Sequence, residues 1–190
     1  LGLWDDAQIE PLARITAFLR SQGATPGIQL AHAGRKAGTA RPWDGGKPLS
    51  DEQGGWPVVS ASAIPFADGY RTPHALSVEE IGQLVAAFRA AAVRSLAAGF
   101  QVIEIHAAHG YLLHNFLSPI SNQRSDAYGG SLENRRRIVV EVARAIRQVW
   151  PEELPLLVRF SGTDWVEGGW TVEETAALSR RLADEGVDLI

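Results

Sequence analysis

Apolar residues recur at helical spacing in several segments of the chain, and polar capping residues mark where some of these segments begin. Ser77 with Glu80, and Thr171 with Glu174, match the pattern in which an N-cap hydroxyl and a glutamate three residues later bond each other's backbone N–H groups. Gly99 and Gly186 follow the corresponding apolar stretches, as expected just beyond a helix end. The pattern predicts helices over residues 7–21, 77–98, 133–149 and 171–185.

Short apolar runs lie between the predicted helices and are typical of buried strands. They cover residues 27–31, 100–106, 154–160 and 187–190, and a weaker strand-like run, 56–62, lies within a long loop. The runs from residue 100 onward are almost continuously apolar, as in parallel strands that are covered on both faces. Because strands and helices alternate, we expect an α/β protein with a parallel sheet.

The absence of one motif narrows the choice of α/β fold. No G-x-G-x-x-G follows a predicted strand, so nothing marks a dinucleotide-binding half of a doubly wound sheet. A (βα)8 TIM barrel is therefore favoured, although such a barrel usually needs roughly 250 residues. About four βα units are visible here, so we expect residues 1–190 to form a single partial TIM-barrel domain, the middle of a barrel truncated at both ends.

Composition limits the classes of partner. Hydrophobic residues make up 45% of the chain and charged residues 21%, which is enough apolar material for a folded core. The net charge of -4 favours a small-molecule substrate over nucleic acid or an anionic membrane. There is no cysteine, no apolar run long enough to span a membrane and no secretory leader pattern, so we expect a cytoplasmic protein.

Candidate chemistry gathers at the predicted carboxyl ends of strands. Gln29, His106 and Arg159 each lie at or near such an end, and in TIM barrels these ends and the loops after them hold the reacting groups. His109 and Tyr111 follow within five residues of His106. Three strands are therefore expected to deliver donors of hydrogen bonds to one rim of the barrel.

Other interpretations of the same residues remain open. His106 and His109 could be structural or could bind zinc, but no third ligand stands at a recognisable spacing. A non-redox barrel enzyme such as a metal-dependent hydrolase, or an inactive fragment, is the alternative. We interpret His74 and His114 as structural, and the arginine run 135–137 as a solvated helix face.

Several segments resemble the old yellow enzyme family of flavin-dependent ene-reductases, and the similarity covers nearly the whole chain. The H-x-x-H pair and the segment RKAGTARPW are most similar to the bacterial branch that includes xenobiotic reductases. The matching segments are IQLAHAGRKA (28–37), GFQVIEIHAAHGYLLHNFLSPISNQRSDAYGGSLENRRR (99–137), LPLLVRFSGTDW (154–165) and LADEGVDLI (182–190).

The resemblance implies an FMN cofactor, with NADPH or NADH as reductant, and a role for each candidate residue. Gln29 would hold the flavin pyrimidine, and Arg159 would stabilise the negative charge of the reduced flavin. His106 and His109 would hydrogen-bond a carbonyl or nitro oxygen of the substrate, and Tyr111 would donate a proton to the α-carbon. No metal is implied.

The resemblance also gives expectations for the full-length protein and for this chain on its own. The strands that in this family cover the flavin and hold its phosphate lie outside residues 1–190, and a full-length member is expected to be a homo-oligomer. An arc of about four strands leaves two open edges. We therefore expect this chain, expressed alone, to be poorly soluble and colourless.

Overall fold

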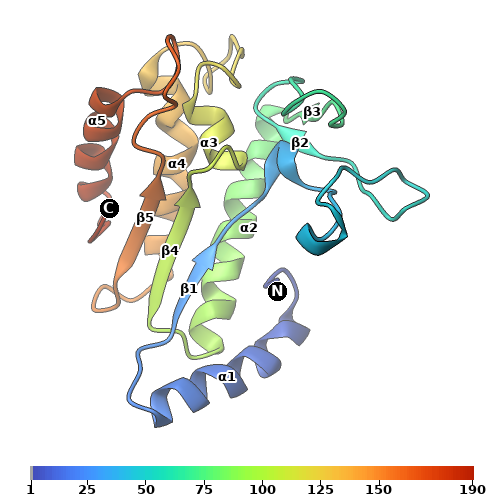
Figure 1. Cartoon of the computed structure of the whole chain (residues 1–190). Coiled ribbons are helices and arrows are strands. Elements are labelled where there is room, and N and C mark those ends of the chain that lie inside the picture. Colours follow the sequence, from blue (N-terminus) through green and yellow to red (C-terminus); the bar gives the residue numbers. More distant parts are fainter. Residues whose placement is uncertain (1) are drawn as a thin grey trace.

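The computed structural model describes residues 2–190 and centres on a parallel sheet of three strands (Figure 1). The strand order is β1 (Gly27–Leu30), β4 (Val102–Ala107) and β5 (Leu156–Phe160). Beyond β5, Leu189 forms a parallel bridge with Leu157, so the chain begins another pairing at that edge. Strand pairing thus confirms the predicted parallel α/β organisation.

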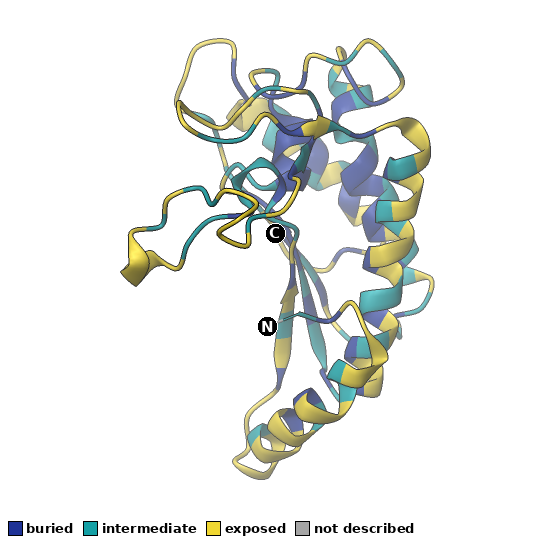
Figure 2. Ribbon diagram, turned by 90° about the vertical axis from the view of Figure 1, so that its right-hand side faces the viewer, coloured by how far each residue is buried: buried dark blue, intermediate teal, exposed yellow. Residues whose placement is uncertain are grey.

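Helices connect the strands and cover one face of the sheet (Figures 1 and 2). Helix α1 (Ile9–Ser21) precedes β1, α2 (Val78–Ala97) leads into β4, and α4 (Leu132–Arg147) leads into β5. Helix α5 (Val172–Ala183) follows β5. These are the βα crossovers that parallel strands require.

The predicted helix starts are confirmed at α2 and α5, and a further cap precedes α1. Ser77 and Glu80 form a reciprocal capping box, and Thr171 and Glu174 form another. Before α1, the Asp5 carboxylate caps a short 3-10 turn, Asp6–Gln8, which leads directly into the helix. Capping groups that are local in the sequence therefore mark these helix starts.

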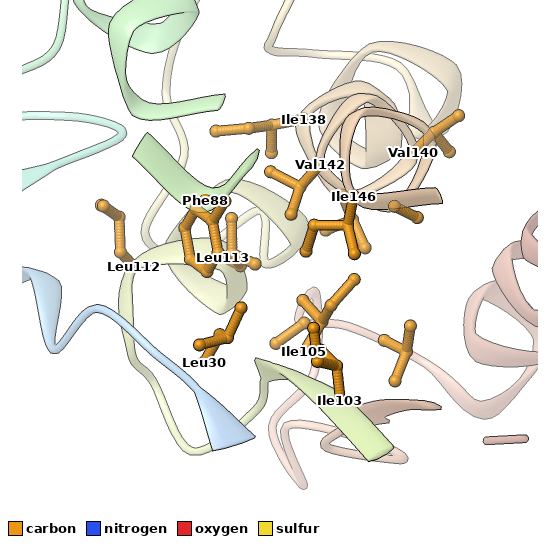
Figure 3. Close-up of a cluster of buried hydrophobic side chains, with 14 of the residues drawn as sticks. Leu30, Phe88, Ile103, Ile105, Leu112, Leu113, Ile138, Val140, Val142 and Ile146 are labelled. Atoms are coloured by element: carbon orange, nitrogen blue, oxygen red, sulfur yellow. The ribbon is translucent and has the colours of Figure 1, made fainter. Parts of the chain in front are cut away.

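Alternation along the strands divides the sheet into an apolar face and a polar face. Ile103 and Ile105 of β4 point toward Ile146 and its neighbours on α4, and both isoleucines are fully buried (Figure 3). Residues of the opposite parity face away from the helices because successive side chains alternate along a strand. Gln29 and Arg159, which belong to this second set, are exposed.

The long segment between β1 and α2 folds over the carboxyl end of the sheet. It contains the 3-10 turns Gly34–Lys36 and Pro42–Asp44. Strands β2 (Val59–Ser60) and β3 (His74–Ala75) pair in parallel, so the predicted strand 56–62 is reduced to two residues.

Helix α3 (Leu112–Leu117) was not predicted from the sequence. All six of its residues are buried, beneath β2 and against α4. A helix that is covered all round has no polar face, and so it lacks the amphipathic spacing by which helices are recognised.

One sequence interpretation is wrong, because Arg135 does not belong to a solvated face. Its side chain is 7% exposed and donates hydrogen bonds to the carbonyl oxygens of Leu117 and Gly130. It also pairs with Glu174 at 2.5 Å. Helix α4 turns this position toward α3 and α5, whereas Arg136 and Arg137 are half-buried and bond to residues of their own helix and the preceding loop.

Membrane insertion through a helix has no support in the described part of the chain. Within residues 2–190, no helix combines the length and the apolar character that crossing a bilayer requires.

We predict that Arg135→Met lowers the free energy of unfolding by about 3 kcal/mol, because it leaves the Glu174 carboxylate and the Leu117 carbonyl without their partner. Arg89→Met is the matched control, since Arg89 lies exposed on α2 and forms no side-chain bond within residues 2–190. Urea unfolding of both variants measures the difference, and equal stabilities would contradict the role assigned to Arg135.

Candidate active site at the carboxyl end of the sheet

Strand register brings the predicted strand residues onto one face. His106 of β4 stands opposite Arg159 of β5, and Gln29 of β1 stands opposite Glu104 of β4. The Gln29 amide nitrogen donates a hydrogen bond to the Glu104 carboxylate. Glu104 was not among the predicted site residues, although the alternation along β4 already placed it on the same face as His106.

The predicted loop residues meet His106 directly after β4. The Nδ1 atom of His109 lies 3.2 Å from the Nε2 atom of His106, within hydrogen-bond distance. The Tyr111 ring stands edge-on to the His106 ring, with 5.1 Å between ring centroids. The structure thus gathers His106, His109 and Tyr111 into one cluster of polar rings.

His106 is the most enclosed member of this cluster. It is 3% exposed, and its Nδ1 atom has no hydrogen-bond partner within residues 2–190. Burial lowers the pKa of His106 below its usual value of 6.5, and the nearby charges of His109 and Arg159 lower it further. At neutral pH His106 is therefore an uncharged imidazole, which can donate through one ring nitrogen.

His114 is structural, as the sequence suggested, and it supports the turn that carries His109. Its Nδ1 atom accepts a hydrogen bond from the Gly110 N–H at 2.8 Å, so its proton is on Nε2. Nε2 donates to Asp164 at 2.8 Å, and both side chains are about nine-tenths buried. His74, by contrast, is exposed and pairs with Glu80 at the start of α2.

Asp164 is ionised throughout the physiological range. Burial by itself raises the pKa of this carboxyl group, but hydrogen bonds from His114, Ser118 and the Trp170 N–H outweigh it and lower the pKa to about 2. The Ser118 and Trp170 bonds measure 2.6 and 2.8 Å. A small cavity of about 170 Å³ adjoins this network and is also lined by Arg35.

A second, larger cavity does not contain the histidine cluster. It measures about 640 Å³ and lies at the free edge of β1, between α1 and α2, where apolar side chains form most of its lining. Gln29 is the one candidate site residue that lines it, and His106, His109, Tyr111 and Arg159 lie outside it. Within residues 2–190, no three histidine, aspartate or glutamate side chains come together as a metal site.

A parallel βα arrangement with polar groups at the carboxyl ends of its strands defines a barrel-type enzyme site. The chain belongs to the NADH:flavin oxidoreductase / NADH oxidase family, which it matches over residues 1–190. It is 52% identical to an NADH:flavin oxidoreductase from Gibberella zeae over 204 residues, covering 100% of this chain and 49% of that protein. It is also 42% identical to an NADPH dehydrogenase from Bacillus velezensis, covering 100% of this chain and 51% of that protein.

Solved structures agree with this assignment and with the barrel. The old yellow enzyme homologue from Zymomonas mobilis superposes with a TM-score of 0.81 at 29% identity, over 99% of this chain and 53% of that one. Morphinone reductase in complex with tetrahydroNAD gives 0.79 at 30% identity, over 98% and 52%. The fold is thus an arc of a TIM barrel, and the chain spans about half the length of the curated relatives it matches.

The polar face fits the FMN cofactor of this family, whose reductant is NAD(P)H. The Gln29 amide gives its N–H to Glu104, which leaves its carbonyl oxygen to accept from a flavin N–H group. Arg159 presents an exposed, permanent positive charge next to His106. Among the described residues, the buried Nδ1 atom of His106 also has no hydrogen-bond partner. These residues could therefore hold a flavin ring across the strand ends.

We predict that the stabilisation contributed by Asp164 depends on pH. Its folded pKa of about 2 lies below the usual 3.8, so the stabilisation is present above about pH 4 and is lost as the pH falls toward 2. Asp164→Asn should therefore destabilise the protein by about 2 kcal/mol at pH 6, and by about 1 kcal/mol less at pH 3. Urea titrations at both values, with the exposed Asp68→Asn as control, measure this difference. A cost that is equal at the two pH values would contradict the assignment.

Proposed function

We propose that the protein containing this chain is an FMN-dependent ene-reductase. It would transfer hydride from NAD(P)H to the C=C bond of α,β-unsaturated carbonyl or nitro compounds. The observation that carries the proposal is the cluster of His106, His109 and Tyr111 beside the face that bears Gln29 and Arg159. The similarity to NADPH dehydrogenases and to morphinone reductase with its bound tetrahydroNAD supports the nicotinamide reductant.

The two histidines would bind the substrate oxygen. Their facing nitrogens are 3.2 Å apart, a separation at which one oxygen can lie about 2.8 Å from both. One ring accepts the present hydrogen bond between the two, so it would shift its proton to the facing nitrogen as the substrate exchanges that bond for two bonds to its own oxygen. Two N–H donors aimed at an oxygen that gains negative charge during reduction would stabilise the transition state.

Tyr111 would supply the proton. Its phenol is a proton donor beside the two rings that would bind the substrate oxygen. The edge-on contact with His106 and the position of Tyr111 at the N-terminal end of α3 fix its ring relative to the oxygen-binding pair. One short turn would thus provide both the oxygen-binding donors and the acid.

Gln29 and Arg159 would hold the cofactor on the same face. When bound, FMN would take hydride from NAD(P)H and give it to the β-carbon of the substrate. The Gln29 carbonyl oxygen would orient the flavin ring. The Arg159 guanidinium would favour its negatively charged reduced form.

A two-step flavin assay tests the proposal. We expect the full-length protein to carry FMN that is bleached by NADPH or NADH without oxygen and regains its colour when cyclohexenone is added, with saturated cyclohexanone as the control. Bleaching that no enone or nitroalkene reverses would contradict the ene-reductase assignment. Stoichiometric zinc in the purified protein would favour a metal-dependent barrel enzyme instead.

We predict that His106→Ala and His109→Ala each slow reoxidation by cyclohexenone about a hundredfold, because each removes one donor to the substrate oxygen. Reduction of the flavin by NAD(P)H should be less affected. His74→Ala is the matched control, since His74 is 58% exposed and lies in β3, outside the cluster. Stopped-flow measurement of the two half-reactions separates the effects, and equal losses in both would count against the assigned role.

A further inference from the structure

The turn that carries His109 has a backbone conformation that requires external support. His109 has φ of 61° and Gly110 has φ of 69°, so two consecutive residues lie in the left-handed region. This region is unfavourable for a residue with a side chain, and such residues persist only where their surroundings hold them. The strain falls on a residue that is proposed to bind the substrate.

Side chains hold three of the four backbone polar groups of His109 and Gly110. The His109 N–H donates to the Ser161 hydroxyl at 3.0 Å, and the Gly110 N–H donates to His114. The Gly110 carbonyl accepts from the Asn115 amide at 2.9 Å. These bonds come from the loop after β5 and from α3, which flank the turn.

Lys36 hydrogen-bonds the fourth group, the His109 carbonyl oxygen, and lies close to Gly110 and Tyr111 as well. Its ammonium nitrogen donates to the His109 carbonyl oxygen at 2.7 Å. The same nitrogen lies 5.7 Å from the centroid of the Tyr111 ring, and a Cβ atom at Gly110 would lie 3.1 Å from it. The nitrogen also lies 4.2 Å from the centroid of the Phe66 ring. The half-buried cation therefore contacts both Phe66 and the turn.

We propose that Lys36 is a positioning residue of the active site, and this inference rests on the proposed function. Its charged hydrogen bond keeps His109 in the left-handed conformation that directs the His109 Nδ1 atom toward His106 Nε2. Its position over the Tyr111 ring fixes the neighbouring acid relative to the same pair. Lys36 acts through His109 and Tyr111 and does not itself bind the reacting atoms.

A purely structural role for Lys36 would lead to a different result. The adjacent Arg35 already fastens the long loop, because its guanidinium donates to the carbonyl oxygens of Ile64 and Pro65. If Lys36 only added to this fastening, its loss would lower stability and leave the geometry of the imidazole pair unchanged. Nitrogen NMR of the imidazole rings distinguishes the two roles, with the His106 and His109 signals assigned from the single alanine variants.

The experiment compares three variants of the full-length protein. Lys36→Met removes the charge and the donor, Lys36→Arg restores both, and Lys47→Met is the matched control, since Lys47 is exposed and makes no side-chain bond within residues 2–190. We expect the His106 and His109 ring nitrogen signals to shift in Lys36→Met, to return toward wild type in Lys36→Arg and to stay unchanged in Lys47→Met. If Lys36→Met folds poorly, Lys36→Gln, which keeps a donor without the charge, takes its place.

Kinetics provide a second measurement on the flavin-loaded protein. We expect Lys36→Met to slow reoxidation by cyclohexenone about tenfold, a loss in the range that misplaced catalytic groups produce, with flavin reduction by NADPH changed less than about twofold. Unchanged imidazole signals in Lys36→Met would overturn the proposal, as would an equal fall in both half-reactions. A wild-type protein without enone activity would overturn the proposed function alone, because the NMR measurement needs neither flavin nor enone.

Discussion

The parallel register of β4 with its two neighbours, β1 and β5, determines where the strand residues of the candidate site lie. It sets His106 opposite Arg159 and, two residues earlier, Glu104 opposite Leu157. A slip of one residue would turn Ile105 outward and bury a charged or polar side chain against α4, so the register is strongly specified. Packing of Ile103 and Ile105 on α4 therefore also fixes the direction in which the site residues on the opposite face point.

His109 and Tyr111, which lie in the loop after β4, are held by a second set of contacts with buried residues. Helix α3 is covered on all sides, and its residues His114 and Asn115 bond the backbone of Gly110. Asp164 reaches the same turn from the loop after β5 and bonds His114. Side chains from two βα loops thus converge on one turn, which explains how a loop can hold His109 and Tyr111 as firmly as a strand holds His106.

Sequence reasoning recovered the features that depend on local pattern. Capping boxes gave the starts of α2 and α5, and strand alternation gave the face on which Gln29, His106 and Arg159 lie. The residues it missed depend on contacts between distant segments. Lys36 and His109 are 73 positions apart in the sequence, and Arg135 and Glu174 are 39 apart. No local spacing therefore predicts either contact.

Glu104 is an intermediate case, because its face was predicted but its partner was not. The alternation along β4 placed its side chain beside those of the candidate site. The bond to Gln29 follows only from the pairing of β1 with β4, which brings together residues 75 positions apart. A pattern within one strand can give the direction of a side chain, whereas its partner depends on which strands become neighbours.

The electrostatics of the site favour negative charge on a bound molecule. Burial is the largest cause of the lowered pKa of His106; the charges of His109 and Arg159 lower it further, and the Glu104 carboxylate opposes them in part. The field of the first two charges lowers the energy of negative charge at the same place, since the two effects differ only in the sign of the charge. Lys36 adds a further cation beside the turn, and Asp164 places its negative charge beneath it. An imidazole N–H of His106 beside the Arg159 guanidinium suits an oxygen that gains negative charge, because a hydrogen bond can stabilise that charge without proton transfer.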